Sequence, residues 1–558
     1  MDHDAIGHLL TCLAQATATI ASWSTVKGLA MFPPHFNSKA FGLLLLQSGT
    51  AVLGYATANA SCSDLATSLQ IPDVRVLVAE SVPAGTNLTF PTVPAGCTQS
   101  QVTLVDICRV RMLLTTGPTS NVTLEHWLPA DWNGRFLATG NGGTNGCVDF
   151  NAINYGAANG FAAIGTNNGH DGFSGLPFLN NPGVIEDFVY RAVHSSASIG
   201  KQVIQTYYTQ PARKSYYLGC STGGRQGFKE AQSFPDDFDG IVAGAPAIAF
   251  NDLNYQSGSV FIATGPPGSP TFLTTAQWSA VVNASIAQCD LLDNVADGVL
   301  EDPDLCQPRF EALLCAANQT NSTTTCLTPT QVETAHRLYS PIYGPQGQLI
   351  FPRFQPGVGS ILISGTPFPY TTDWWRYVVY NDTTWDPTTL GLDDWVAETA
   401  VNPFNIQTFL GDLSAVRDRG TKVLHYHGLQ DGLISSENSR RYYEFVQRTM
   451  GATYDELDDF YRYFRISGMG HCSGGSGASV IGNGKTNTWT HDADGNVLQA
   501  MVRWVEQGVA PETIEGAKFK TGGNGTEVEY TRRHCRWPRR NVWDRKGDVA
   551  DPDSWKCE

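Results

Sequence analysis

Ser221 lies in the stretch Gly219-Cys220-Ser221-Thr222-Gly223, which has the G-x-S-x-G form of a nucleophile elbow. A serine hydroxyl is a poor nucleophile at neutral pH, so it needs a base that takes its proton and a carboxylate that orients the base. Asp431 and His471 follow in that order late in the chain. Because α/β-hydrolases carry their residues in the order serine, acid, histidine, these three predict a catalytic triad.

These residues also have simpler interpretations. A lone G-x-S-x-G is a weak signal, and its weight here comes from the strand expected before it and the helix expected after it. Asp431 follows the stretch His425-Tyr426-His427-Gly428 and could be an ordinary turn-forming aspartate. His427 is more simply a packed histidine than a base. His471, in the glycine-rich loop after a late strand, is the better candidate base.

A tetrahedral intermediate needs two backbone N–H donors for its oxyanion. The residue after the nucleophile, Thr222, is expected to supply one. Gly142 or Gly143, in the loop Gly140-Asn141-Gly142-Gly143, could supply the other because glycine lets the backbone approach a substrate closely. That loop could also be a plain tight turn.

The cysteines next to the candidate triad suggest a covalent link. Cys220 directly precedes the serine and Cys472 directly follows the histidine. If they pair, one bond ties the candidate nucleophile to the candidate base. The chain has 13 cysteines, of which Cys12 lies in the N-terminal segment, so 12 remain for six bridges.

A second group of residues has the chemistry of a cation site. Asp290, Asp293 and Asp297 lie with Gly298 in a short stretch bounded by Cys289 and Cys306. Calcium favours carboxylates together with backbone carbonyls. The spacing is not that of an EF-hand, so a solvated acidic turn is the alternative.

Elements around Ser221 alternate between strand and helix. Apolar positions at three- to four-residue spacing predict a helix over 185–208, and the segment 224–234 reads as another. Short strands are expected at 135–139, 161–166, 215–218 and 240–243. This alternation predicts the α/β class with a parallel sheet, preceded by an irregular β-rich entry over 61–130.

The alternation is lost from residue 247 to 419, a stretch with four cysteines and four of the sequons. We expect an inserted domain there, which divides the catalytic domain into 61–246 and 420–558. Beyond the insertion, the pattern resumes with strands at 422–426 and 461–467 and helices at 437–450 and 498–506.

Composition indicates a globular, exported protein. The formal net charge of −16 disfavours nucleic-acid binding. After residue 60 the sequence contains no run of 18 apolar residues, so we expect no membrane span there. Residues 1–60 resemble a signal peptide region, with an apolar run over 41–53 and Ala58-Asn59-Ala60 as an A-x-A site. This region lies far enough from the first residue that Met31 is a candidate true start; a membrane anchor is the alternative. Seven N-glycosylation sequons, at Asn87, Asn121, Asn283, Asn318, Asn321, Asn381 and Asn524, fit secretion.

At its chemical motifs the chain resembles the tannase family of secreted fungal esterases, and most of all the type B feruloyl esterases. The resemblance extends from Cys62 to Cys557. It rests on four stretches: 217–227 around Ser221, the Phe234-Pro235-Asp236-Asp237-Phe238-Asp239-Gly240 segment, 427–431, and 466–472 around His471.

The resemblance implies an α/β-hydrolase core with a large inserted lid, and a triad of Ser221, Asp431 and His471. It implies a disulfide between Cys220 and Cys472. It also implies a structural calcium ion in the lid, held by the side chains of Asp290, Asp293 and Asp297 and the carbonyls of Val295 and Val299. The remaining bridges implied are Cys62–Cys108, Cys97–Cys147, Cys289–Cys306, Cys315–Cys326 and Cys535–Cys557.

These inferences favour a secreted esterase that hydrolyses feruloyl and related hydroxycinnamate esters of plant cell-wall polysaccharide. Aromatic residues of the insertion, including Trp374, Trp375 and Tyr377, could stack on the phenolic ring, or could be ordinary core residues. A tannase acting on galloyl esters is the alternative, because it would share the triad. A non-catalytic, carbohydrate-binding protein on the same fold is a third interpretation, which the complete triad disfavours.

Overall fold

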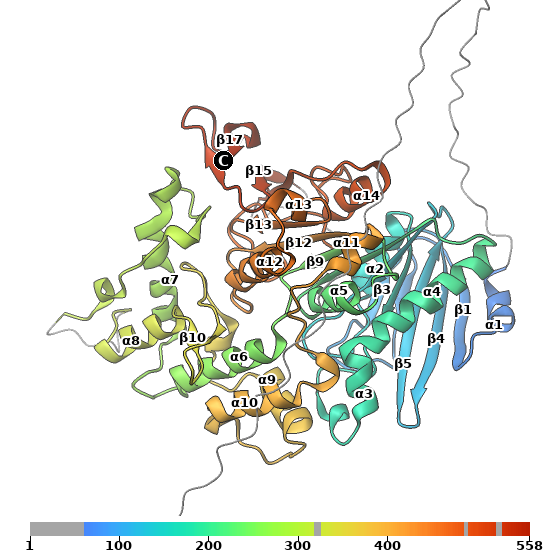
Figure 1. The fold of residues 1–558 in the computed structure, drawn as a ribbon, viewed down its shortest axis with the longest axis horizontal. Helices are drawn as coiled ribbons and strands as arrows, with labels where there is room; N and C mark the ends of the chain where they lie inside the picture. The colour runs from blue at the N-terminus through green and yellow to red at the C-terminus, as the bar shows by residue number, and fades with distance from the viewer. Residues whose placement is uncertain (1–60, 317–324, 485–488, 521–526) are drawn as a thin grey trace, which may run out of the picture. The chain divides into compact units, whose positions relative to one another are not determined.

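A nine-stranded mixed sheet organises the protein (Figure 1). The structure, a computed structural model, describes residues 61–316, 325–484, 489–520 and 527–558. The predicted signal region and the sequons at Asn318, Asn321 and Asn524 lie outside these residues. Within them, no helix is both long and apolar enough to cross a membrane.

The strands follow the order β1-β4-β5-β7-β6-β8-β9-β12-β13. Six of them, from β7 to β13 in that order, are parallel, which confirms the predicted α/β class. Their bounds are β7 (Ala162–Thr166), β6 (Arg135–Thr139), β8 (Lys214–Cys220), β9 (Gly240–Gly244), β12 (Lys422–Gly428) and β13 (Tyr461–Ile466).

The N-terminal part of the chain is more regular than predicted. It forms three long antiparallel strands of the same sheet, β1 (Val74–Val82), β4 (Ile107–Gly117) and β5 (Ser120–Pro129). The prediction of an irregular entry over 61–130 is wrong in this respect. Both faces of β4 and β5 are largely buried, so the polar–apolar alternation that marks a half-exposed strand is weak in their sequence.

Helices cover both faces of the sheet (Figure 1). Residues of α4 (Ala192–Tyr208), α5 (Thr222–Ser233) and α12 (Ser436–Met450) belong to one apolar core, and residues of α2 (Phe150–Ala158) and α14 (Val497–Gln507) belong to another. Neighbouring strand residues alternate between the cores: Phe136 joins the first and Leu137 the second.

The helix predicted over 185–208 has an interruption. It consists of α3 (Pro182–Glu186), a π-helical segment Asp187–Arg191, and α4. The buried carboxylate of Asp187 accepts hydrogen bonds from the hydroxyl of Thr116, at 2.7 Å, and from Arg191 Nε, at 2.5 Å. These contacts come from a distant strand and from the helix itself, so the apolar periodicity alone does not show the wider turn.

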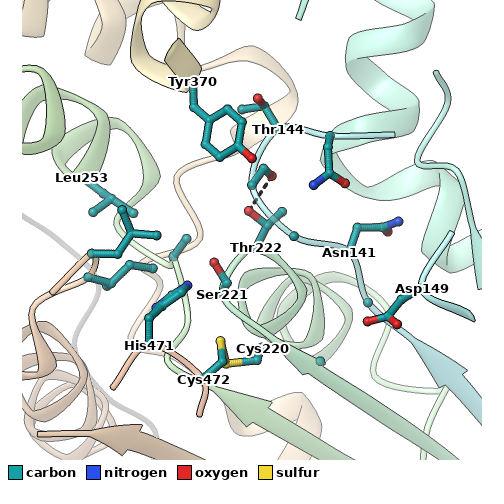
Figure 2. A pocket seen from close by; sticks show the side chains of 18 of the residues that line it. Asn141, Thr144, Asp149, Cys220, Ser221, Thr222, Leu253, Tyr370, His471 and Cys472 are labelled. Carbon is teal, nitrogen blue, oxygen red and sulfur yellow. Dashed lines mark hydrogen bonds between the residues drawn. A yellow bond between two sulfur atoms is a disulfide. The ribbon is translucent and has the colours of Figure 1, made fainter. Parts of the chain in front are cut away.

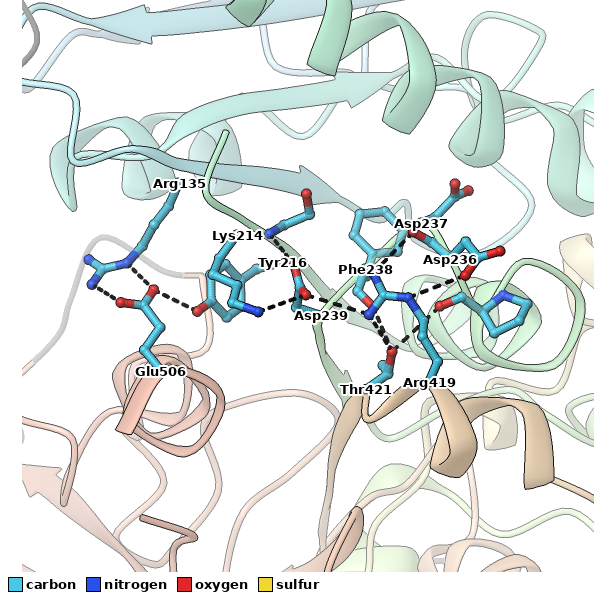
Figure 3. Close-up of polar contacts among 12 residues, drawn as sticks. Arg135, Lys214, Tyr216, Asp236, Asp237, Phe238, Asp239, Arg419, Thr421 and Glu506 are labelled. Atoms are coloured by element: carbon cyan, nitrogen blue, oxygen red, sulfur yellow. Dashed lines mark hydrogen bonds and ion pairs between the residues drawn. The ribbon is translucent and has the colours of Figure 1, made fainter. Parts of the chain in front are cut away.

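The segment 234–240 has a structural role at the amino-terminal ends of the central strands (Figure 3). Ser221 lies at the opposite, carboxyl-terminal end of β8. Asp239 Oδ2 accepts from the amide of Ser215 at 2.9 Å, and Oδ1 accepts from Lys214 Nζ at 3.1 Å. The carbonyl of Asp239 accepts from the amide of Lys422 at 2.9 Å. Asp239 thus joins the amino-terminal ends of β8, β9 and β12.

The described residues between β9 and β12 add no strand to this sheet, in agreement with the predicted interruption. They form a small hairpin and a set of helices: α6 (Phe250–Thr264), α7 (Thr275–Cys289), α8 (Pro329–Leu338), α9 (Pro369–Trp374), α10 (Leu392–Val401) and α11 (Ser414–Arg419), with β10 (Ile342–Tyr343) and β11 (Leu349–Phe351). That this insertion acts as a separate lid stays a prediction. The C-terminal tail forms a second hairpin, β14 (Thr513–Phe519) and β15 (Val528–Cys535).

Candidate active site

Ser221 sits at the sharp turn between β8 and α5. Its backbone angles are φ 65° and ψ −124°, and a positive φ is strained for a residue other than glycine. The turn needs small neighbours: a Cβ on Gly219 would lie 2.6 Å from the carbonyl oxygen of Gly223, and one on Gly224 would lie 2.3 Å from that of Gly244. The strand–elbow–helix context predicted for the serine is therefore present.

Asp431 and His471 come together beside the serine. Asp431 follows β12, and its Oδ1 accepts from the amides of Leu433 at 2.8 Å and Ile434 at 2.9 Å. Its Oδ2 accepts from His471 Nδ1 at 2.7 Å. Figure 2 shows the imidazole of His471 pointing toward the hydroxyl of Ser221. Asp431 is thus both a turn-forming residue and the partner of the histidine.

The environment of Asp431 favours its carboxylate form. Burial opposes ionisation of this side chain, but the charge of His471 and hydrogen bonds from His427 and His471 outweigh burial and hold the pKa of Asp431 well below its ordinary value. The carboxylate can therefore fix the ring orientation of His471 and stabilise its imidazolium form.

A disulfide joins the two loops that carry the serine and the histidine. Cys220 and Cys472 are bonded, with their Cα atoms 6.0 Å apart. Figure 2 shows this bond directly below Ser221 and His471. The structure also contains the other five pairs that the resemblance implies, Cys62–Cys108, Cys97–Cys147, Cys289–Cys306, Cys315–Cys326 and Cys535–Cys557.

Ser221 and His471 open into a cavity of about 720 Å³. Its wall includes aromatic side chains, Phe173 from before the insertion and Phe250, Phe368 and Tyr370 from within it, along with polar side chains such as Asn145, Asp149 and Asn254. Trp374 and Trp375 are fully buried in the core of the insertion and do not line this cavity, nor does Tyr377. For these residues the core alternative holds, because α9 and the π-helical segment Trp375–Val379 that follows it pack them against an apolar core, with Tyr377 only partly buried.

The predicted oxyanion donors line the same cavity as Ser221. The amides of Gly140 and Asn141 are engaged, with the carbonyl of Leu218 and with Gln226 Oε1. Thr222 begins α5, and its hydroxyl donates to the carbonyl of Gly143 at 2.7 Å. Gly142, Gly143 and Thr222 all line the cavity, and their role as oxyanion donors stays a prediction.

His427 contacts the acid, which the sequence alone did not indicate. Its Nε2 lies 3.0 Å from Asp431 Oδ2 and 3.1 Å from the carbonyl of Ile434. Because a carbonyl can only accept, Nε2 carries the proton and donates to both. In this tautomer, Nδ1 accepts from the hydroxyl of Ser439, at 2.6 Å.

The hydrogen bonds continue away from the acid in one direction. Since the Ser439 proton goes to His427, its oxygen accepts from His425 Nε2, at 2.8 Å, and His425 Nδ1 accepts from the hydroxyl of Tyr461, at 2.8 Å. Burial lowers the pKa of His425 well below its ordinary value, so this ring is neutral. We call Tyr461, His425, Ser439 and His427 the donor chain, because each donates toward Asp431.

The predicted calcium residues form a carboxylate-rich turn after α7. Asp290, Asp293 and Asp297 each accept a hydrogen bond from a backbone amide of the turn through Oδ1, at 2.9 to 3.0 Å. Burial, opposed by a backbone hydrogen bond and reinforced by the charges of Glu301 and Asp297, raises the pKa of Asp293 to about 7. Carboxylate oxygens are ligands that calcium prefers, but among the described residues these three side chains do not converge to within 4.8 Å of one another, and Asp297 Oδ2 is also 3.1 Å from Arg532 Nη2. Calcium binding here stays a prediction.

Comparison with known proteins agrees with this architecture. Residues 108–558 match the model of the family "Tannase and feruloyl esterase". A probable feruloyl esterase B of Emericella nidulans is 50% identical over 512 residues, 91% of this chain and 96% of that protein. Feruloyl esterase C of Talaromyces stipitatus is 51% identical over 501 residues, 89% and 94% of the two chains.

The fold has an equally similar counterpart among solved structures. The crystal structure of feruloyl esterase B from Aspergillus oryzae superposes with a TM-score of 0.86, at 46% identity, over 89% of this chain and 99% of that one. The family match covers most of the chain, and the similarity to these relatives runs nearly end to end. This chain therefore belongs to the tannase and feruloyl esterase family.

Proposed function

We propose that the protein is a secreted serine esterase that hydrolyses feruloyl and related hydroxycinnamate esters of plant cell-wall polysaccharide. The observation that carries the proposal is the hydrogen bond from His471 to the buried carboxylate of Asp431, at the mouth of an aromatic-lined cavity that contains Ser221. Relatives near 50% identity that are named feruloyl esterases support the ester class.

The first half-reaction acylates the serine. His471 Nε2 takes the proton of Ser221 as the hydroxyl oxygen attacks the ester carbonyl. The amide of Thr222 and that of Gly143 or Gly142 donate to the developing oxyanion. The tetrahedral intermediate collapses when the C–O bond to the alcohol breaks and His471 returns the proton to that oxygen.

The second half-reaction repeats these steps with water. His471 takes a proton from water as its oxygen attacks the acyl-enzyme, and the intermediate expels the oxygen of Ser221, which recovers the proton. The phenolic acid leaves. Asp431 stays ionised throughout, because the pKa of this carboxyl lies well below its ordinary value.

The aromatic wall supports a phenolic acyl group. Phe173, Phe368 and Tyr370 offer faces and edges on which a phenolic ring can stack. A galloyl ring carries three hydroxyls that need partners, so a tannase would need a more polar wall. Initial rates on methyl ferulate and methyl gallate separate the two activities, and a clear preference for gallate would sink the feruloyl assignment.

Labelling by a fluorophosphonate probe tests the serine. Wild-type protein should be labelled, and Ser221→Ala should not, while circular dichroism shows both to be folded. Ser233→Ala, at the far end of α5, is the matched control and should be labelled. Failure of the folded wild type to react would favour the non-catalytic, carbohydrate-binding alternative.

Secretion is supported by covalent and surface features. Six disulfides are typical of oxidising compartments. The sequon asparagines Asn87, Asn121, Asn283 and Asn381 are all exposed. Expression of the full reading frame in a fungal host should place the protein in the medium, with a mass that falls on endoglycosidase treatment; retention of unprocessed protein in the cells would refute secretion.

We further propose that Asp290, Asp293 and Asp297, with the carbonyls of Val295 and Val299, bind calcium. The ion would supply charge neutralisation that holds the turn together. Adding calcium to chelated protein should raise the melting temperature, and Asp293→Asn should remove that rise. Asp544→Asn, in another acidic turn where Asp544 accepts from two backbone amides, is the control. An equal rise in all three proteins would contradict the site.

A further inference from the structure

Three side chains that can bind a metal meet on the face of the sheet that α4 and α5 cover, away from the candidate active site. His194 comes from the first turn of α4, Glu230 from the last turn of α5, and Asp237 from the loop between α5 and β9. One ligand atom of each lies within 4.8 Å of the other two. His194 Nδ1 lies 2.6 Å from Asp237 Oδ2.

Glu230 is the unexplained member of this group. Its side chain is in the core, with 1% of the residue exposed, and no described donor reaches either carboxyl oxygen; its hydrogen-bonding neighbour is the carboxyl of Asp237, which it can bond only when it is protonated. A buried polar group without a donor destabilises the folded protein, and an ion is one of the ordinary reasons that such a group is retained. Burial, reinforced by the charge of Asp237, raises the pKa of Glu230 well above its ordinary value.

The basic side chains nearby are engaged elsewhere. Lys201 Nζ donates to the backbone carbonyl of Asp237 at 2.6 Å, and Lys229 Nζ donates to the carbonyls of Phe404 and Asn405. Arg419 pairs with Asp236 and Asp239, as Figure 3 shows. No described cation therefore forms an ion pair with the carboxyl of Glu230. The charges of Lys201 and Lys229 act on this carboxyl only at longer range.

We propose that His194, Glu230 and Asp237 bind a divalent transition-metal ion, for which Zn²⁺ is the best match. One imidazole nitrogen and two carboxylate oxygens are ligands that zinc accepts, whereas calcium and magnesium favour oxygen alone. Binding replaces the proton of Glu230, which is released to solvent. The side chain of His194 is 38% exposed, so the ion can enter and a water molecule can complete the tetrahedron.

The ring of His194 is already held for this task. It stacks on Phe234, with ring centroids 3.8 Å apart and planes inclined by 17°. The last turn of α5, which carries Glu230, presents the negative end of the helix dipole and favours a cation. An ion here would join α4, α5 and the loop before β9, so its expected effect is on stability.

Isothermal titration with ZnCl₂ tests the site in the full-length, folded protein, in buffer that contains millimolar calcium. The wild type should bind one zinc ion in addition to any bound by the catalytic histidine, which His471→Ala removes from the count. His194→Ala and Glu230→Gln in the His471→Ala background should weaken this binding by tenfold or more. His336→Ala is the matched control, since His336 Nε2 pairs with Glu311 at 2.9 Å on the surface.

Two further measurements make the test decisive. Zinc binding should release about one proton, seen as a dependence of the heat on the buffer, because Glu230 must lose its proton. Zinc should raise the melting temperature of His471→Ala but not that of the double variants. The proposal is overturned if His471→Ala binds no zinc, if the double variants bind it as tightly, or if only His336→Ala loses it. The esterase activity does not enter the test, so its outcome is independent of the proposed function.

Discussion

The donor chain that ends at Asp431 makes a prediction for Ser439→Ala. In the protein, the Ser439 hydroxyl holds the Nδ1 atom of His427 at 2.6 Å and thereby orients the ring whose Nε2–H donates to Asp431. Without that hydroxyl, the His427 ring loses its anchor at Nδ1 and can turn its Nε2–H away from the carboxylate. The carboxylate then loses one donor and keeps His471 as its remaining side-chain partner.

The expected size of the effect follows from the bond that is lost. A hydrogen bond to a charged group contributes about 1.5–3 kcal/mol, and about 1.4 kcal/mol corresponds to one pKa unit. With less of its charge neutralised by His427, Asp431 stabilises the imidazolium of His471 more strongly. The acid limb of kcat/KM should therefore move to higher pH, by up to about one pH unit.

The assay is the pH dependence of kcat/KM on methyl ferulate. Ser285→Ala is the matched control, because Ser285 is also a buried helical serine, whose hydroxyl donates only to the carbonyl of Val281, at 3.0 Å. Both variants should lose some stability, but only Ser439→Ala should shift the acid limb. His427→Gln, whose amide can still donate to Asp431, should shift it less than His427→Ala does. An acid limb that stays at the wild-type pH in Ser439→Ala would refute a positioning role for the chain.

Three more predictions test other parts of the molecule. Replacing both Cys220 and Cys472 by serine should lower kcat on methyl ferulate by about tenfold or more, because small displacements between reacting groups are costly; the Cys535→Ser/Cys557→Ser double variant, which opens a disulfide outside the cavity wall, should retain kcat. Gly143→Ala should lower kcat with little change in KM, since Gly143 has φ +55° and its new Cβ would lie 2.4 Å from the ring of Tyr370. Gly451→Ala, with φ +61° and open space around it, controls for backbone strain. Equal kcat values for the two variants would contradict the prediction. Glu398→Gln should stabilise the protein increasingly as pH rises above about 4.5, by up to about 1.4 kcal/mol per pH unit. The sign follows because burial raises the pKa of Glu398 in the folded protein, so the wild type loses stability across that range; a pH-independent difference in melting temperature would contradict it.

The sequence predicts the parts of this protein that are local. Gly219 and Gly223 flank Ser221 because the turn excludes side chains, and short apolar runs between helices predict parallel strands. The interruption after β9 is also visible, since the alternation of elements stops there.

Features that depend on which face a residue presents were not predictable. Trp374 and Trp375 lie in the same helical region as Phe368 and Tyr370, yet the first pair is fully buried and the second lines the cavity. Composition cannot distinguish them, because both orientations bury aromatic surface. The interrupted helix at Asp187 has the same origin, since its partner Thr116 lies on a distant strand.

The two histidines of β12 show how a buried polar group and its role are connected. His425 and His427 are two residues apart on a strand, so both side chains point to the face that α12 covers, while Leu424 and Tyr426 join the opposite core. Two imidazoles in a buried strand would be costly without partners. Ser439 on α12 and Tyr461 on β13 supply those partners, and the direction of the resulting bonds leaves one donor over. That remaining donor is His427 Nε2–H, which donates to Asp431. A leucine at either position would avoid the cost of burying an imidazole, but it would also remove one link of the donor chain. The two buried histidines of β12 are therefore best explained by the hydrogen bond that the chain makes to the carboxylate of Asp431.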